Sequence, residues 1–334
     1  MWKSHLNYHP RLGYTYAPNF LGRIPRKNGG FLLRTNAAGF RSDRDFIAAP
    51  NGQYRVLLFG DSQTAGLGVG NPQRFSDRLE ALVPDLEIYN FAVDGTGTDQ
   101  QYLTYLEHRQ IAHDLIVIGL FVDDVARVGS SHLRFQDADG REVFYPKPYY
   151  RAESGNLLLQ GLPVPKRPCT RGSLPASAAQ ATSLNAFMMK MRQAPAVRKL
   201  ADRLRLTSLV QQMRARSGPT GYSSVKSPGW RLLSLILRTW IAESSVPVLL
   251  LPIPLWTFLD SSAEPGGYRL RLRELAIDTG CLLHDLLPDL RGYPPTERAS
   301  FHFPSDTHLS AAGHAAIAHS LAPALARLVA RQRS

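Results

Sequence analysis

The sequence predicts an α/β fold built on a parallel sheet, and three observations lead to that prediction. Several short runs are continuously apolar, as expected of strands that are buried on both faces. Stretches of helix length separate these runs. The two kinds of segment alternate along the chain, which is typical of right-handed β-α-β crossovers.

The predicted elements follow in chain order. The first strand begins after Arg55 and is followed by Gly60. The five predicted strands are Val56–Phe59, Leu86–Ala92, Leu115–Leu120, Val246–Leu251 and Cys281–His284. The predicted helices are Pro72–Leu82, Thr98–Gln110, Trp230–Ser244, Tyr268–Thr279 and a final one from Ala311 to about Arg331.

The alternation divides the chain into three parts. Residues 1–50 are rich in Gly, Pro, Asn, Arg and Tyr without a sustained period, and we expect a loop-rich N-terminal extension packed on the core. Residues 51–150 and 230–334 form the predicted α/β core. Residues 151–229 are rich in Pro, Ser and Arg, so we interpret them as a basic, partly helical insertion or cap.

Composition excludes several classes of protein. The 334-residue chain is 44% hydrophobic and 20% charged, which is ordinary for a globular protein and unlike a disordered one. Its longest apolar runs, Leu115–Val122 and Val246–Leu255, are far shorter than a membrane-spanning helix. No signal-peptide h-region is visible, and two cysteines make neither a disulfide framework nor a zinc spacing. We therefore expect a cytoplasmic protein without metal or cofactor.

The net charge of +12 is unevenly distributed. Residues 151–217 contain 12 Lys or Arg and only two acids. Such a segment can attract an anionic polymer or a membrane surface, or simply form the solvated face of helices. Nucleic acid is not an expected partner, because the chain has no helix-turn-helix or RNA-binding motif.

The turn after the first strand contains the first candidate catalytic residue. Ser62 follows Gly60-Asp61 at the carboxyl end of a central strand, where α/β proteins bind their ligands. The helix that begins here offers free N–H groups to a developing oxyanion. Alternatively, Ser62 or Thr64 simply caps that helix.

A second cluster precedes the last helix. A serine nucleophile needs a general base and a carboxylate to orient it, and His308 and Asp306 lie two residues apart on one loop. Alternatively, Asp306 and Ser310 are caps and turn formers. His302, His308 and His314 recur every six residues, which suits no helix face, so a metal triad is not expected.

Together these motifs resemble the SGNH (GDSL-type) hydrolase family. Gly60-Asp61-Ser62 resembles its nucleophile block, Asn90–Gly95 its second block and Asp306-Thr307-His308 its last block. The resemblance implies a flavodoxin-like three-layer α/β/α sandwich around a central, mostly parallel five-stranded sheet. It also implies that Ser62 is the nucleophile, that His308 is the general base and that Asp306 orients His308. The backbone N–H groups of Ser62 and Gly95 would form the oxyanion hole.

Further motifs are similar to bacterial members of the family that accompany polysaccharide or glycan biosynthesis. They are Leu12–Tyr14, Asn36–Arg41, Gly97–Gln100 and His314 after Gly313. The match covers roughly residues 10–125 and 245–330 and leaves the basic insertion poorly matched.

One residue departs from the family pattern. The third block usually contains Asn-Asp, whose Asn donates a hydrogen bond to the oxyanion, and here Asp123 precedes Asp124. An ionised carboxylate only accepts hydrogen bonds, and loss of one such donor typically costs about 10²–10³ in turnover. Asp123 is either kept neutral by burial, turned away, or replaced in its role by another side chain. Otherwise the site is weakened.

We therefore expect a serine esterase or deacylase that acts on an acylated carbohydrate or a similar ester through an acyl-enzyme on Ser62. An O-acyltransferase would use the same site, with a glycan hydroxyl resolving the acyl-enzyme. A non-catalytic glycan- or surface-binding protein on a hydrolase scaffold is the alternative from a different class, and Asp123 and the basic insertion give it weight.

Overall fold

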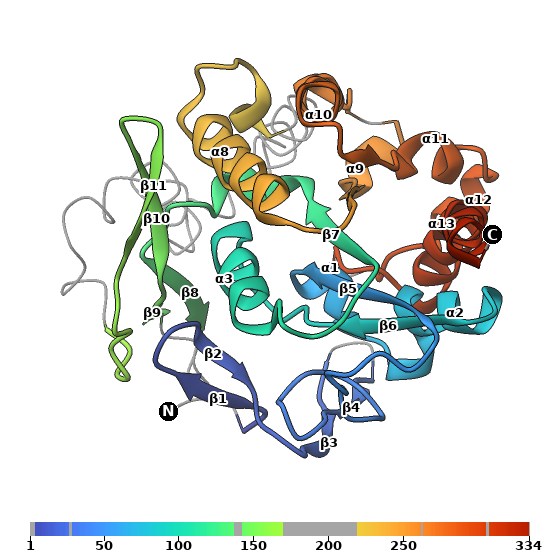
Figure 1. The fold of residues 1–334 in the computed structure, drawn as a ribbon, viewed down its shortest axis with the longest axis horizontal. Helices are drawn as coiled ribbons and strands as arrows, with labels where there is room; N and C mark the ends of the chain where they lie inside the picture. Colours follow the sequence, from blue (N-terminus) through green and yellow to red (C-terminus); the bar gives the residue numbers. More distant parts are fainter. Residues whose placement is uncertain are drawn as a thin grey trace, which may run out of the picture.

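The structure is a computed structural model that describes residues 4–26, 29–136, 142–169, 219–261, 263–304 and 307–333. Its centre is a five-stranded sheet in the order β13-β12-β7-β5-β6 (Figure 1). All neighbouring strands in this sheet are parallel, which confirms the predicted parallel sheet. The strands are β5 (Tyr54–Gly60), β6 (Leu86–Asn90), β7 (Leu115–Phe121), β12 (Val248–Ile253) and β13 (Leu282–Leu283).

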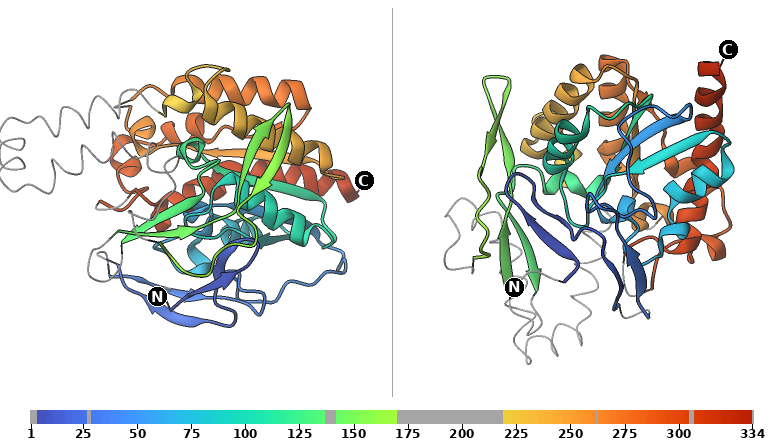
Figure 2. Two further views of the ribbon diagram at one scale, coloured as in Figure 1. Left: turned by 90° about the vertical axis from the view of Figure 1, so that its left-hand side faces the viewer. Right: turned by 60° about the horizontal axis from the view of Figure 1, so that its bottom comes forward.

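Helices cover both faces of the sheet and complete three layers (Figure 2). On one face α3 (Thr98–His108) packs against α8 (Pro228–Glu243), which in turn packs against α10 (Gly266–Thr279). The other face carries α2 (Phe75–Leu82), α11 (Leu286–Arg291) and α13 (Ala311–Arg333). Shorter helical segments are α1 (Ser62–Ala65), α9 (Trp256–Leu259), α12 (Pro295–Arg298), η1 (Asn71–Gln73), η2 (Val122–Ala126) and η4 (Thr220–Tyr222).

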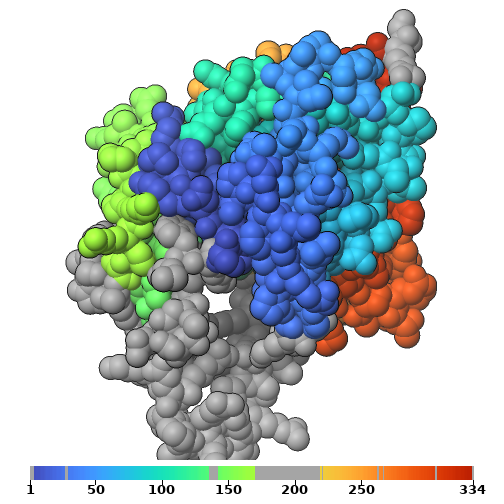
Figure 3. All heavy atoms as spheres, turned by 90° about the horizontal axis from the view of Figure 1, so that it is seen from below, coloured from blue at the N-terminus to red at the C-terminus, as the bar shows by residue number. Residues whose placement is uncertain are grey.

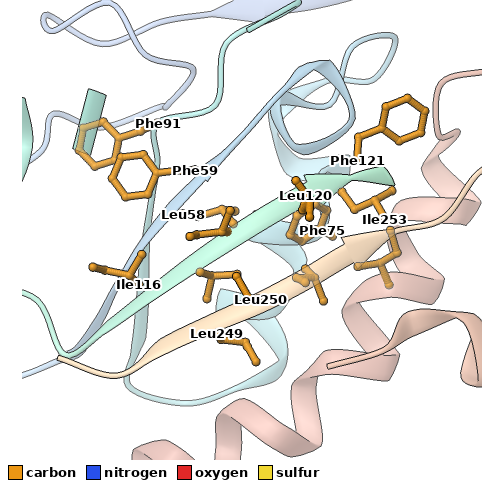
Figure 4. Close-up of a cluster of buried hydrophobic side chains, with 14 of the residues drawn as sticks. Leu58, Phe59, Phe75, Phe91, Ile116, Leu120, Phe121, Leu249, Leu250 and Ile253 are labelled. Carbon is orange, nitrogen blue, oxygen red and sulfur yellow. The ribbon is translucent and has the colours of Figure 1, made fainter. Parts of the chain in front are cut away.

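The core lies on both sides of the central strands. Every residue of β5 and β7 is buried, which explains why Val56–Phe59 in β5 and the whole of β7 are continuously apolar rather than alternating. Figure 4 shows the side chains of Leu58, Ile116 and Leu250 in this cluster. Within the described ranges, no helix combines the length and the apolar character needed to cross a bilayer.

Two short hairpins occupy the N-terminal segment, where the sequence predicted no strands. β1 (Leu6–His9) pairs with β2 (Gly13–Tyr16), and β3 (Leu21–Ile24) pairs with β4 (Phe31–Arg34). In Figure 3 this segment spreads over one face of the molecule as a continuous blue surface. Strands of four residues interrupted by Gly, Pro and Asn are too short to produce a period that sequence inspection detects.

Two more antiparallel hairpins precede the basic segment. β8 (His132–Gln136) pairs with β9 (Glu142–Pro146), and β10 (Tyr149–Glu153) pairs with β11 (Asn156–Gln160). The second hairpin crosses residue 151, where the predicted insertion begins. The helical part that was predicted within the insertion lies outside the described residues.

Candidate active site

The candidate nucleophile, Ser62, is the first residue of α1, directly after β5. Asp61 caps this helix, because its carboxylate accepts a hydrogen bond from the Gln63 N–H at 2.9 Å. Ser62 is 6% exposed and lies at the carboxyl edge of the sheet, as the sequence predicted. The alternative that Ser62 or Thr64 caps this helix is therefore wrong, because Asp61 supplies the cap and Ser62 keeps its hydroxyl for other contacts.

Glycine is required at two strand positions beneath this helix. Gly60 of β5 and Gly119 of β7 lie opposite each other in the sheet, and Thr64 of α1 packs over both. A Cβ atom added to Gly60 would lie 2.2 Å from the Thr64 Oγ1, and one added to Gly119 would lie 2.3 Å from the same oxygen. The two glycines thus let α1 sit directly on the central strands.

His308 meets the nucleophile across the edge of the sheet. Its Nε2 lies 2.9 Å from the Ser62 Oγ, which is within the reach that a general base requires. The chain around His308 folds back on itself, since the Phe303 N–H donates to the His308 carbonyl at 3.1 Å. The structure therefore brings together two side chains that are 246 residues apart.

Asp306, which was predicted to orient His308, lies outside the described residues. Its role remains a prediction.

The predicted oxyanion donors are the N–H groups of Ser62 and Gly95. Gly95 has a φ of +77°, and a Cβ there would lie 3.0 Å from the Leu133 Cδ2 and 3.1 Å from the Tyr14 hydroxyl oxygen. Both the left-handed backbone and the crowding require glycine at this position. Within the part of the chain that the structure describes, neither N–H has an assigned hydrogen-bond partner, so both are available to a substrate.

The N-terminal hairpin holds the loop that carries Gly95. The Tyr14 hydroxyl donates to the Asp94 carbonyl at 2.7 Å, and the Tyr16 hydroxyl donates to the Asp94 carboxylate at 2.6 Å. From the other side, the Thr96 hydroxyl donates to the Gly60 carbonyl at 3.2 Å. The loop is therefore attached both to the hairpin and to the strand that precedes the nucleophile.

A second residue of the N-terminal segment, Arg41, supports the other end of α1. Its guanidinium donates to the carbonyls of Ala65, Gly66 and Val69, each at 2.7 Å. Arg41 is 1% exposed, and burial lowers its pKa to about 10, so it remains a cation at neutral pH. These bonds satisfy the carbonyls at the C-terminus of α1 and so fix the helix that carries Ser62.

Asp123, which replaces the expected asparagine, is exposed at the start of η2. The buried acid of this turn is its neighbour, Asp124, which is 0% exposed. The Arg127 Nη1 lies 2.8 Å from the Asp124 carboxylate and 3.0 Å from that of Asp61. One guanidinium nitrogen thus joins the acid beside the nucleophile to the acid after β7.

These two carboxyls differ in how they are satisfied. The Asp61 carboxylate accepts hydrogen bonds from Gln63 and Arg127, whereas neither oxygen of Asp124 accepts an aligned hydrogen bond within the described residues. Burial raises the pKa of Asp124 well above its ordinary value, and Asp61 raises it further. Burial also raises the pKa of Asp61, against the opposing effect of Arg127. The environment therefore favours a proton on Asp124.

The other two histidines of the predicted series lie in separate environments. His314 is buried, accepts a hydrogen bond from the Phe75 N–H at 3.2 Å and has its pKa lowered to about 3 by burial. The His302 ring contacts Trp256, with 3.7 Å between ring centroids. No cluster of three potential metal ligands occurs in the described ranges.

Sequence reasoning missed four residues that support the site: Tyr16, Arg41, Gln63 and Arg127. Arg41 belongs to a motif that the resemblance singled out, and Tyr16 lies two residues after another, but hydrogen bonding to loops far along the chain leaves no local pattern. Gln63 contacts the backbone on both sides of His308. Arg127 follows Asp124 at a spacing of three, which is the only sequence signal of their contact.

The sequence also matches a known protein family. The sequence model of the GDSL-like Lipase/Acylhydrolase family matches residues 58–316. No curated protein matches the sequence. Similar solved structures include a lipolytic G-D-S-L protein from Veillonella parvula (11% identity, 82% of this chain and 99% of that chain covered, TM-score 0.44). Another is a lipase/acylhydrolase from Enterococcus faecalis (14% identity, 82% of this chain and 96% of that chain covered, TM-score 0.41). A third is an acetylxylan esterase from Geobacillus stearothermophilus (12% identity, 82% of this chain and 94% of that chain covered, TM-score 0.43).

Proposed function

The chain belongs to the GDSL-like lipase/acylhydrolase family, and from that premise we propose that it cleaves a carboxylic ester through an acyl-enzyme on Ser62. The observation that carries this proposal is the 2.9 Å contact between the Ser62 Oγ and the His308 Nε2. The contact joins a nucleophile to a base, and the N–H groups of Ser62 and Gly95 are the proposed donors to the oxyanion.

The proposed reaction begins with proton transfer. The Ser62 Oγ attacks the ester carbonyl carbon while its proton passes to the His308 Nε2. The N–H groups of Ser62 and Gly95 stabilise the resulting oxyanion. The tetrahedral intermediate then collapses, and the leaving alcohol takes the proton from His308. Water, activated by the same histidine, releases the acid and restores Ser62.

Two residues set the charge around these steps. Imidazolium forms beside Asp61, whose carboxylate oxygen lies 3.5 Å from the Ser62 Oγ and 3.0 Å from Arg127. Arg127 balances that carboxylate, so the nucleophile is not surrounded by uncompensated negative charge. In this proposal Asp306 orients the other nitrogen of His308.

We propose an acylated carbohydrate as the substrate class. The support is the sequence resemblance of the N-terminal motifs to bacterial members that accompany glycan biosynthesis. Residues of those motifs, among them Tyr14 and Arg41, contact the loops that carry Gly95 and Ser62. The motifs therefore belong to the machinery of the site rather than to a separate module.

The test is hydrolysis of acetylated oligosaccharides compared with p-nitrophenyl acetate, using wild type and Ser62→Ala. Acetate release that depends on Ser62 supports the hydrolase. Transfer of the acetyl group to an added sugar, at the expense of acetate release, would identify an O-acyltransferase. Binding to an acidic polysaccharide without turnover of any ester would overturn both and leave a binding protein.

The basic segment 151–217 is proposed to attract an acidic partner, either an anionic polymer or a membrane surface. Among its described residues, Arg151, Lys166 and Arg167 are exposed. A KM for acidic acetylated oligosaccharides that rises with salt, beside an unchanged KM for p-nitrophenyl acetate, would support this attraction.

We propose a cytoplasmic location because of the state of the cysteines. Both cysteines of the chain, Cys169 and Cys281, are free thiols, which is typical of a reducing compartment. Fractionation of the native host with antibody detection tests it.

A further inference from the structure

Gln63 lies between the nucleophile and the base although it belongs to neither. It follows Ser62 in α1 and is 3% exposed. Its Nε2 donates to the Thr307 carbonyl at 3.3 Å, and its Oε1 accepts from the Leu309 N–H at 3.1 Å. One buried amide therefore bonds to the backbone immediately before and immediately after His308.

The chemistry of this contact is specific to a primary amide. The Thr307 carbonyl needs a donor, whereas the Leu309 N–H needs an acceptor, and an amide is the neutral side chain that presents both in one plane. Only one orientation of the Gln63 amide satisfies both partners. An apolar side chain of similar length would fill the same space and make neither bond.

The contact also has a mechanical consequence. Ser62 and Gln63 are consecutive residues of one helix turn, so the helix that presents the nucleophile also holds the backbone of the base. The separation of the Ser62 Oγ and the His308 Nε2 is then determined by α1 rather than by the free conformation of the His308 loop. Displacement of a reacting group by about 1 Å can cost about 10²-fold in rate.

We propose that Gln63 is a positioning residue that fixes His308 against Ser62 by bonding to the backbone on both of its sides. This inference rests on the proposed function, because it assigns His308 the role of base. Gln63 itself touches no reacting atom.

The test uses two variants of equal length. Gln63→Met removes both hydrogen bonds and keeps the volume. Gln63→Glu keeps both bonds while its carboxyl is protonated and loses the donor when it ionises. We expect Gln63→Met to lower kcat about 10- to 100-fold with KM changed less than about threefold. The ratio of Gln63→Glu to wild-type activity should rise as the pH falls.

A double-mutant cycle separates positioning from a general structural role. In a His308→Ala background, added imidazole should restore part of the activity, and free imidazole needs no positioning by Gln63. With imidazole present, the rate of the Gln63→Met/His308→Ala double variant should lie within about twofold of the rate of His308→Ala alone. An equal loss in both backgrounds would overturn the proposal, as would an unchanged kcat in the wild-type background.

Amide hydrogen exchange gives a readout that needs no activity. Gln63→Met should speed exchange of the Leu309 N–H at least about tenfold, while exchange in the central strands stays unchanged. Unchanged exchange at Leu309 would overturn the inference by itself. If wild type hydrolyses no ester but Leu309 exchange rises, the backbone contact is real and its catalytic role falls together with the proposed function.

Discussion

The turns after β5 and after β7 leave the sheet side by side, and they differ in how their polar groups are satisfied. They start near Gly60 and Gly119, which lie opposite each other. After β5, Asp61 caps a helix and Ser62 contacts His308. After β7, one acid is exposed and the next is buried without an aligned hydrogen bond. The first turn positions the reactive groups, whereas the second sets the charge around them.

The comparison also explains why Arg127 matters to both turns. It belongs to the second turn, but its guanidinium contacts Asp61 in the first turn and Asp124 in the second, so it joins the two turns. Substitutions in the first turn should therefore lower activity by removing a reactive group, whereas those in the second should act through charge.

Ser62→Ala should abolish chemistry while leaving the fold intact. Removal of a serine nucleophile typically costs at least about 10⁴-fold in kcat. The Asp61 cap does not depend on the Ser62 hydroxyl, so the melting temperature should change by less than about 2 °C. Ester hydrolysis and thermal melting of the same preparation check this. Retention of more than about a tenth of the wild-type kcat would contradict it.

Arg127→Gln should lower kcat about 10- to 100-fold, because it leaves the buried Asp61 carboxylate without its cation beside a developing oxyanion. Arg127→Lys serves as the control, since it keeps the charge and should recover part of the activity. Steady-state kinetics of both variants give the two kcat values to compare. If Arg127→Gln and Arg127→Lys lower kcat equally, charge compensation is the wrong explanation.

Tyr16→Phe removes the hydroxyl that holds Asp94 beside Gly95, and kcat should fall about 3- to 10-fold. Tyr8→Phe is the matched control, because the Tyr8 hydroxyl makes a 2.6 Å bond to the Val164 carbonyl and does not contact that loop. Each variant should lose about 1 kcal/mol of stability. Equal kinetic losses for the two variants would rule out a specific role for the first hairpin in the oxyanion hole.

Asp124→Asn should change how stability depends on pH. Because the folded-state pKa of Asp124 is raised, the native state holds the proton more tightly than the unfolded state. The wild type therefore loses unfolding free energy as the pH rises above about 4, and the uncharged Asn variant does not. Chemical denaturation at pH 4 and pH 7 should show the unfolding free energy of the variant increasing relative to that of the wild type as the pH rises. If the difference in unfolding free energy between variant and wild type is the same at both pH values, Asp124 is not the group that titrates.

Asp123→Asn restores the family residue and should change kcat less than about threefold, since the side chain is exposed. This is the smallest of the expected effects, so a large change in kcat would be easy to recognise. An increase of about 10²-fold would mean that position 123 reaches the oxyanion after all.

The sheet was predictable from the sequence because its strands, such as Leu115–Phe121, are buried on both faces and therefore continuously apolar. The contact between Ser62 and His308 was predictable because both residues lie in sequence blocks that resemble those of a known family. The hairpins of the N-terminal segment were not, since four-residue strands leave no period.

The supporting contacts were equally hidden. Gln63 meets Leu309 across 246 positions, and Arg41 meets Ala65 across 24. No local pattern reports such pairs, because they depend on how the loops meet at the edge of the sheet. The burial of Asp124 and the exposure of Asp123 also follow from the turn geometry after β7 rather than from the residues themselves.

The most direct test of the central claim is intact-mass labelling with a fluorophosphonate probe on wild type, Ser62→Ala and His308→Ala. Such a probe reacts with a serine that is activated by its base and its oxyanion donors. One adduct on wild type, absent from both variants, is the predicted result. Folded wild type that takes up no probe would contradict the account, because the contact between Ser62 and His308 would then not activate the serine.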